Sequence, residues 1–266
     1  GGLRESTILR AIAASWVTDI PHDRWPAGVE FLQDVRDALH LQTGRNSDVL
    51  IQQDQAAVAD ALGIADRDVL LRRVYDAARS IAYASDVAWY RVGRQSRPSP
   101  RLSFRPVSRP QSRVGADRVP LADGVIVQSG EVVLANDADP SRDPVLVLRC
   151  AAAAAQAGLP MAPHTVSRLA VESMPMPRPW PPSAREAFVS LIGAGPATVD
   201  VWEALDQAGI ITALIGSWDV VRSAPQRDPL HRFTVDRHLV ECAVAASSLT
   251  RRVDRPDLLL VGALLH

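Results

Sequence analysis

Apolar residues recur at helical spacing along most of this 266-residue chain, and clusters of proline interrupt that spacing in a few places. The longest apolar stripe runs from Asp68 to about Tyr90, and another helix is expected to have Pro26 in its first turn and to end at Gly44. A period of three to four residues is typical of helices that bury one face. Proline inside a helix removes a hydrogen-bond donor and clashes with the preceding turn, so the proline clusters mark helix ends. The pattern predicts a mainly α protein with helical bundles separated by proline-rich breaks.

Further helices are expected on both sides of these breaks. Asp66 precedes the long stripe, where an aspartate accepts hydrogen bonds from the first free amides of a helix. Ser183-Ala-Arg-Glu186 has the form of a capping box, so a helix is expected to begin there. The remaining helices are expected at about 3–18, 50–63, 143–158, 197–215, 233–248 and 255–266.

Two regions depart from the helical pattern. Between residues 91 and 118, arginine occurs eight times against one acid, Asp117, and prolines at four positions exclude a helix. We interpret this stretch as an extended, solvated linker, and an arm for a phosphate-bearing partner is the alternative. Nucleic acid is not expected as a partner, because only Phe104 could stack on a base. Residues 119–136 carry apolar runs around Ser129-Gly130, which predicts a short β-hairpin.

Bulk composition narrows the functional classes only a little. The 29 basic residues, all arginine, balance 30 acidic ones to a net charge of −1, which points to no particular partner. No apolar run reaches the roughly 18 residues that a membrane helix needs, so no membrane association is expected. We interpret Cys150 and Cys242 as two reduced, buried thiols of a cytoplasmic protein rather than as metal ligands.

Two histidines are candidates for metal chemistry. His238 lies in an expected helix, and His266 closes the apolar run that begins near Asp257. Histidines from two helices are the first ligands of HD-type phosphohydrolases, which also need an aspartate after the second histidine and another further on; such ligands hold divalent metals that activate water. On spacing alone, two ordinary core or surface histidines remain the alternative.

Other catalytic centres are not indicated. Nucleotidyl transfer of the polymerase-β type needs Gly-Ser shortly before an Asp-x-Asp pair that holds Mg²⁺. Asp137 and Asp139 have no such Gly-Ser, and Pro140 follows directly, so we interpret the pair as part of a turn. The chain contains no Gly-x-Ser-x-Gly, no P-loop and no Gly-x-Gly-x-x-Gly motif.

Four segments together resemble one family, the bifunctional uridylyltransferase/uridylyl-removing enzymes that modify the PII nitrogen-signalling protein. Gly1-Gly2-Leu3-Arg4-Glu5 is similar to the family's Gly-Gly-Leu-Arg-Asp, with Glu5 keeping the carboxylate. The others are residues 31–63, residues 202–238 and Leu260-Val-Gly-Ala-Leu-Leu-His266. The resemblance implies that Gly1, Gly2, Arg4 and Glu5 close the nucleotidyltransferase core.

The resemblance also implies a site and a division of the chain. His238 and His266 would be metal ligands of an HD domain, and five residues would line or brace that site: Arg222, Gln226, Asp228, His231 and Asp236. Residues 1–91 would be the helical tail of a nucleotidyltransferase domain, 92–118 a linker, 119–230 a β-hairpin with a helical linking region, and 231–266 the start of a truncated HD domain.

The function implied is the attachment of a nucleotide to PII and its removal in response to glutamine. The parent enzyme would use UTP or ATP and a divalent Mg or Mn ion, and uridylyl versus adenylyl transfer stays open. Glutamine sensing by C-terminal domains and the catalytic transferase core are expected outside this chain, so the 266 residues alone are expected to be inactive. The alternative is a helical interaction module whose basic arm, within residues 91–118, binds an anionic partner.

Overall fold

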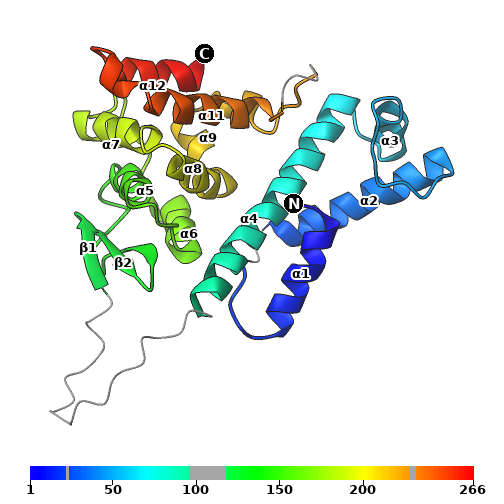
Figure 1. Ribbon diagram of the computed structural model, residues 1–266, viewed down its shortest axis with the longest axis horizontal. Coiled ribbons are helices and arrows are strands. Elements are labelled where there is room, and N and C mark those ends of the chain that lie inside the picture. The colour runs from blue at the N-terminus through cyan, green and yellow to red at the C-terminus, as the bar shows by residue number, and fades with distance from the viewer. Residues whose placement is uncertain (22–23, 96–117, 228–231) are drawn as a thin grey trace, which may run out of the picture. The chain divides into compact units, whose positions relative to one another are not determined.

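The computed structural model describes residues 1–21, 24–95, 118–227 and 232–266 and is mainly helical (Figure 1). The mainly α fold class expected from the sequence is confirmed. The chain divides into two compact units, one formed by Gly1–Val107 with Arg222–Val235 and the other by Ser108–Val221 with Asp236–His266. Most of the arginine-rich stretch, residues 96–117, lies outside the described residues, so the linker and the basic arm stay predictions.

In the first unit, three helices pack against one long helix. They are α1 (Leu3–Ala14), α2 (Trp25–Thr43) and α3 (Gln55–Ala61), and the long helix is α4 (Arg67–Gln95). The apolar stripe of α4 supplies Leu70, Ile81 and Ala88 to the buried core. Two apolar clusters form, one around Leu9 and Val29 where α1 and α2 meet α4, and one around Val58 where α3 does.

The ends of these helices follow the local signals in the sequence. Gly44 ends α2 in the left-handed region, at φ 62°, and its amide donates to the carbonyl of His40. At the start of α4, Asp66 Oδ1 accepts hydrogen bonds from the amides of Asp68 and Val69, at 2.7 and 2.8 Å. Both predicted helix ends are therefore confirmed.

Gly28 of α2 lies directly against α4. A Cβ atom placed on Gly28 would lie 2.7 Å from Ser80 Oγ and 3.1 Å from the carbonyl oxygen of Ala77. Ser80 is buried, and its hydroxyl donates to that same carbonyl at 2.8 Å. The two helices can approach this closely only because residue 28 has no side chain.

Gly28→Ala should therefore destabilise the first unit by about 1–3 kcal/mol, the usual cost of forcing extra volume into a packed interior. Hydrogen exchange at the amides of α2 and α4 would measure the loss. Gly93→Ala is the matched control: no atom lies within 4 Å of a Cβ at this α4 position, so alanine should be neutral or stabilise by up to ~1 kcal/mol. Equal protection in both variants would contradict the close approach.

The sheet of the second unit has three antiparallel strands in the order β1-β2-β3: β1 (Arg118–Ala122), β2 (Val125–Gln128) and β3 (Glu131–Leu134). The hairpin predicted around Ser129-Gly130 is confirmed as β2 and β3, with Gln128 opposite Glu131. Strand β1 was not expected as a separate strand. Gly124, at φ +72°, makes the turn that pairs it with β2, and Pro120 is tolerated because β1 is an edge strand.

Helices α5 to α12 complete the second unit, and the alanine-rich α5 is buried along most of its length. Helices α7 and α8 and the sheet pack against α5. Their bounds are α5 (Leu146–Ala157), α6 (Pro163–Glu172), α7 (Pro182–Ile192), α8 (Ala197–Gln207), α9 (Ile210–Leu214), α10 (Trp218–Val221), α11 (Val235–Ser247) and α12 (Pro256–Leu265).

The start of α7 differs from the sequence prediction. The helix begins at Pro182 with Pro181 as its N-cap residue, and no side chain caps it. The expected capping box at Ser183 and Glu186 is therefore wrong. Proline is favoured in the first turn, where its missing N–H has no helical partner to lose, so the helix starts one residue before the serine.

A line of aromatic rings crosses the core of the second unit, although aromatic residues make up only 5% of the chain. Trp180, Phe188, Trp202 and Trp218 follow one another, with ring centroids 5.4, 6.3 and 5.1 Å apart. Trp218 Nε1 also donates to the buried carboxylate of Asp206, at 3.1 Å. This line joins α7, α8 and the short α10 into one packed layer.

Candidate metal centre

Helix α11 carries two of the side chains that form the candidate centre. His238 and Cys242 are four residues apart, which places them one above the other on the same side of the helix. Both are half-buried, whereas Leu239, Val240 and Ala243 on the inner side are buried. The packed face of α11 thus fixes the helix, and the side chains of His238 and Cys242 project at its rim.

Helix α12 supplies the third side chain at its C-terminal end. Its buried leucines, Leu260 and Leu264, hold the helix in the second unit, where it packs against α7. His266 follows the last helical residue and is exposed. Its Nδ1 lies 3.0 Å from the carbonyl oxygen of Ala263. A carbonyl can only accept, so we infer that Nδ1 carries the hydrogen and that Nε2 keeps a free lone pair.

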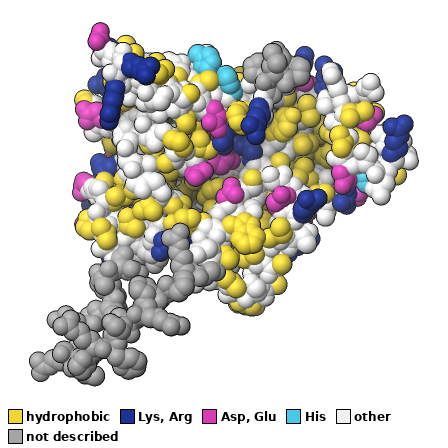
Figure 2. All heavy atoms as spheres, in the orientation of Figure 1, with side chains coloured by type: hydrophobic (Ala, Val, Ile, Leu, Met, Phe, Trp, Pro, Cys, Tyr) yellow, Lys and Arg dark blue, Asp and Glu magenta, His cyan; other side chains and the backbone are white. Residues whose placement is uncertain are grey.

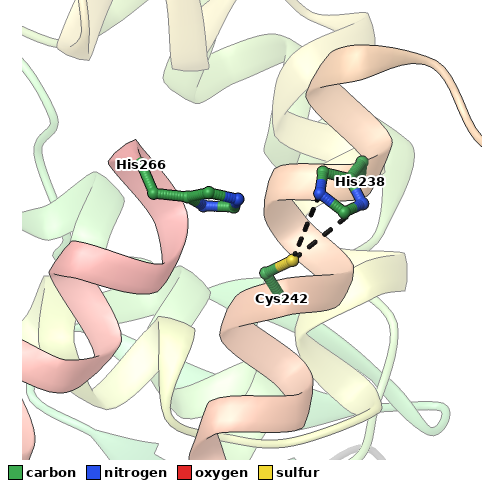
Figure 3. Close-up of side chains that lie close together, drawn as sticks. All are labelled: His238, Cys242 and His266. Atoms are coloured by element: carbon green, nitrogen blue, oxygen red, sulfur yellow. Dashed lines mark hydrogen bonds between the residues drawn. The ribbon is translucent and has the colours of Figure 1, made fainter. Parts of the chain in front are cut away.

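The three side chains converge, as Figure 3 shows. The Sγ atom of Cys242 lies 3.6 Å from Nε2 and 4.0 Å from Nδ1 of His238. The rings of His238 and His266 are 5.5 Å apart at 62°. One ligand atom from each residue lies within 4.8 Å of the other two. In Figure 2, histidine side chains gather at the surface over α11 and α12, so solvent reaches this cluster.

The sequence prediction named both histidines of this cluster but not its cysteine. Cys242 is a free thiol, as expected, but it is half-buried rather than buried, and it lies beside His238, the candidate ligand. The spacing of four residues within one expected helix was the signal that could have identified it. Cys150 fits the prediction: it is a buried free thiol, and burial raises the pKa of its thiol to about 12.

An exposed ion pair marks the start of α12. Arg255 donates two hydrogen bonds to the carboxylate of Asp257, at 3.0 and 2.7 Å. These bonds lower the pKa of Asp257 from its usual value near 3.8 to about 2. Asp257 also lies in the first turn, where a negative charge faces the positive end of the helix dipole.

Because the folded pKa of Asp257 is lowered, its charge should support α12 at every pH above about 4, and that support should fade only as the pH falls toward 2. The carboxyl carbon of Asp257, followed by NMR, should titrate near pH 2. In Arg255→Gln the same resonance should titrate closer to 3.8. A midpoint that does not move in the variant would contradict the role of Arg255.

Among the described residues, the structure does not bring together all of those that were expected to brace the two histidines. Asp236 is buried in the first turn of α11, two residues before His238. Arg222 belongs to the first unit, where its Nη1 donates to Asp76 Oδ1 at 2.6 Å. Gln226 is half-buried, and Asp228 and His231 lie outside the described residues. The bracing role of these residues stays a prediction.

The glycines at the other end of the chain begin the first unit. Gly2 precedes α1, in which Arg4 is exposed and Glu5 lies in the first turn. A Cβ atom on Gly1 would lie 2.3 Å from the carbonyl oxygen of Ala78, so the backbone passes directly against α4. Gly1 is thus required for packing. Its link to a transferase core, like that of Gly2, Arg4 and Glu5, stays a prediction.

The Asp137-x-Asp139 pair forms a turn, as predicted. Oδ1 of Asp139 accepts from the amide and the hydroxyl of Ser141, at 3.0 and 2.6 Å, and Oδ2 pairs with Arg142 at 3.2 Å. These hydrogen bonds lower the pKa of Asp139, with the Ser141 hydroxyl as the main cause. The carboxylate of Asp139 therefore stabilises its own loop through Ser141 and Arg142.

Comparison with known proteins finds similarity to one family along this chain. The family model described as GlnD PII-uridylyltransferase matches residues 1–88. The resemblance predicted from the sequence extends much further, since curated bifunctional uridylyltransferase/uridylyl-removing enzymes match along the whole chain. The enzyme of Streptomyces coelicolor is 55% identical, and that of Mycobacterium tuberculosis 43% identical, over 100% of this chain.

The match covers only part of those relatives. The chain spans 32% of the Streptomyces enzyme, 33% of the Mycobacterium enzyme and 37% of the enzyme of Corynebacterium glutamicum, which is 33% identical. The predicted family resemblance, to actinobacterial enzymes in particular, is confirmed. No solved structure matches the chain significantly. Among the described residues, no helix is both long and apolar enough to cross a membrane.

Proposed function

We propose that the protein containing this chain attaches a uridylyl group to the PII signal protein and removes it again, in response to glutamine. The observation that carries the proposal is the match of the entire chain to enzymes named for these two activities, at up to 55% identity. The two units suit two activities, because residues 1–88 match the transferase family and the histidine cluster lies in the other unit.

Within this proposal, His238 and His266 are metal ligands of the removal site. Neutral imidazoles are good ligands for divalent metals, and the two rings already face a common point from adjacent helix ends (Figure 3). When bound, a divalent ion lowers the pKa of a water molecule and polarises a phosphoryl oxygen. The hydrogen bond from His266 Nδ1 to Ala263 orients that ring and leaves Nε2 toward the ligand position.

The proposal is tested with the full-length protein and PII from the same organism. Incubation with UTP should add one uridylyl group to each PII subunit, detected by intact-protein mass, and withdrawal of UTP with added glutamine should reverse the modification. ATP in place of UTP tests adenylyl transfer in the same assay. PII that remains unmodified with either nucleotide would overturn the proposal.

A further inference from the structure

We propose that Cys242 is a third metal ligand beside His238 and His266, so that this centre binds a thiophilic divalent ion of the zinc class in preference to Mg²⁺. This inference rests on the proposed metal role of the two histidines, and it changes the expected ion. Neither the family resemblance nor the spacing of the histidines assigns a ligand role to the cysteine.

The distance between Cys242 and His238 already suits a shared ion. Zinc lies about 2.3 Å from a thiolate sulfur and about 2.0–2.1 Å from an imidazole nitrogen, so a tetrahedral site separates the two ligand atoms by about 3.5 Å. The Sγ atom of Cys242 lies 3.6 Å from His238 Nε2. A rigid helical turn holds both residues, so this half of the site needs little rearrangement to bind an ion.

His266 completes a three-ligand face. Its candidate ligand atom lies within 4.8 Å of the other two, and its side chain is exposed. Two imidazoles and one thiolate thus supply three ligand atoms of the kinds that zinc binds.

The chemistry of the ligands selects the ion. Mg²⁺ prefers oxygen ligands in octahedral geometry, whereas the ligand atoms of this cluster are one sulfur and two nitrogens. The acid closest to Cys242 in sequence, Glu241, is held by Arg237 through hydrogen bonds of 2.7 and 2.9 Å. A thiolate with imidazoles favours zinc over magnesium. The thiol would release its proton when the ion binds, because the thiolate is the ligand form.

A cobalt substitution in the full-length protein tests the ligand directly. After removal of bound metal with a chelator, Co²⁺ should produce the near-ultraviolet sulfur-to-cobalt charge-transfer band that requires a coordinated thiolate. Cys242→Ser should lose this band and bind Zn²⁺ at least about tenfold more weakly, with Mg²⁺ binding unchanged. Cys150→Ala is the matched control, and it should keep the band because Cys150 is buried away from the cluster.

A second measurement needs no variant and so does not depend on folding of the serine protein. Iodoacetamide should alkylate Cys242 at least about tenfold more slowly with Zn²⁺ than with Mg²⁺, while the buried Cys150 stays unreactive in both. A cobalt band that persists in Cys242→Ser, or alkylation at one rate with both ions, would overturn the inference. Neither readout uses PII, so this failure is separate from failure of the proposed function.

Discussion

In the enzyme proposed above, replacing His238 with alanine should strongly slow removal of the uridylyl group from PII while leaving its attachment nearly unchanged. His238 is one of the two proposed imidazole ligands, and it lies in the second unit, whereas residues 1–88 match the transferase family. Loss of a metal ligand costs more than loss of a residue that merely orients one, for which the usual decrease is 10–100-fold. We therefore expect the removal rate to fall by at least about a hundredfold, measured as the loss of label from uridylylated PII.

His164→Ala is the matched control for this variant. His164 is an exposed histidine in α6 of the same unit, away from the cluster, so both activities should stay near their normal values. A removal rate in His238→Ala equal to that of the control would exclude His238 as a ligand. Loss of both activities together, with faster hydrogen exchange along α11, would instead assign His238 a structural role.

The first unit was the most predictable part of the fold, because its signals are local. The left-handed Gly44, the capping Asp66 and the long apolar stripe of α4 each act within a few residues of the element that they define. The approach of Gly28 to Ser80, in contrast, joins residues 52 positions apart. Helical periodicity in the sequence does not predict such a contact. Glycine has a low helix propensity, so its presence in α2 is explained only when the neighbouring helix is known.

The second unit departed from prediction where tertiary packing decided the outcome. Helix α6 is short and buries only three residues, Thr165, Val166 and Leu169, so its apolar pattern is too sparse to recognise. Strand β1 contains a proline, which is usually a signal against a strand, and only its edge position makes it possible.

The candidate centre shows the same division between local and tertiary signals. The spacing of four between His238 and Cys242 is visible in the sequence. It indicates a metal site only together with His266, which the fold brings beside them at the end of α12. The position of His266 depends on the burial of Leu260 and Leu264, which fixes the end of α12 beside α11. A sequence shows which side chains could bind a metal, whereas packing decides which of them meet.

Trp218→Ala should destabilise the second unit by about 3–5 kcal/mol, the usual cost of deleting a large buried ring. Trp218 is 2% exposed and ends the line of aromatic rings, 5.1 Å from Trp202. Its Nε1 donates to Asp206, which is itself 1% exposed. The substitution therefore leaves a cavity and also removes a hydrogen bond from a buried carboxylate. Faster hydrogen exchange at the amides of α5 and α8 would report the loss within this unit.

Trp218→Phe separates these two contributions, because phenylalanine keeps most of the ring packing and lacks the N–H donor. We expect it to cost about 1–3 kcal/mol, the penalty for depriving a buried polar group of one partner. Trp16→Ala is the exposed control: at 93% exposure its ring has almost no packing to lose, so the change should stay within ~0.5 kcal/mol. If the phenylalanine variant were as unstable as the alanine variant, the hydrogen bond to Asp206 rather than the aromatic packing would hold α10 against α8.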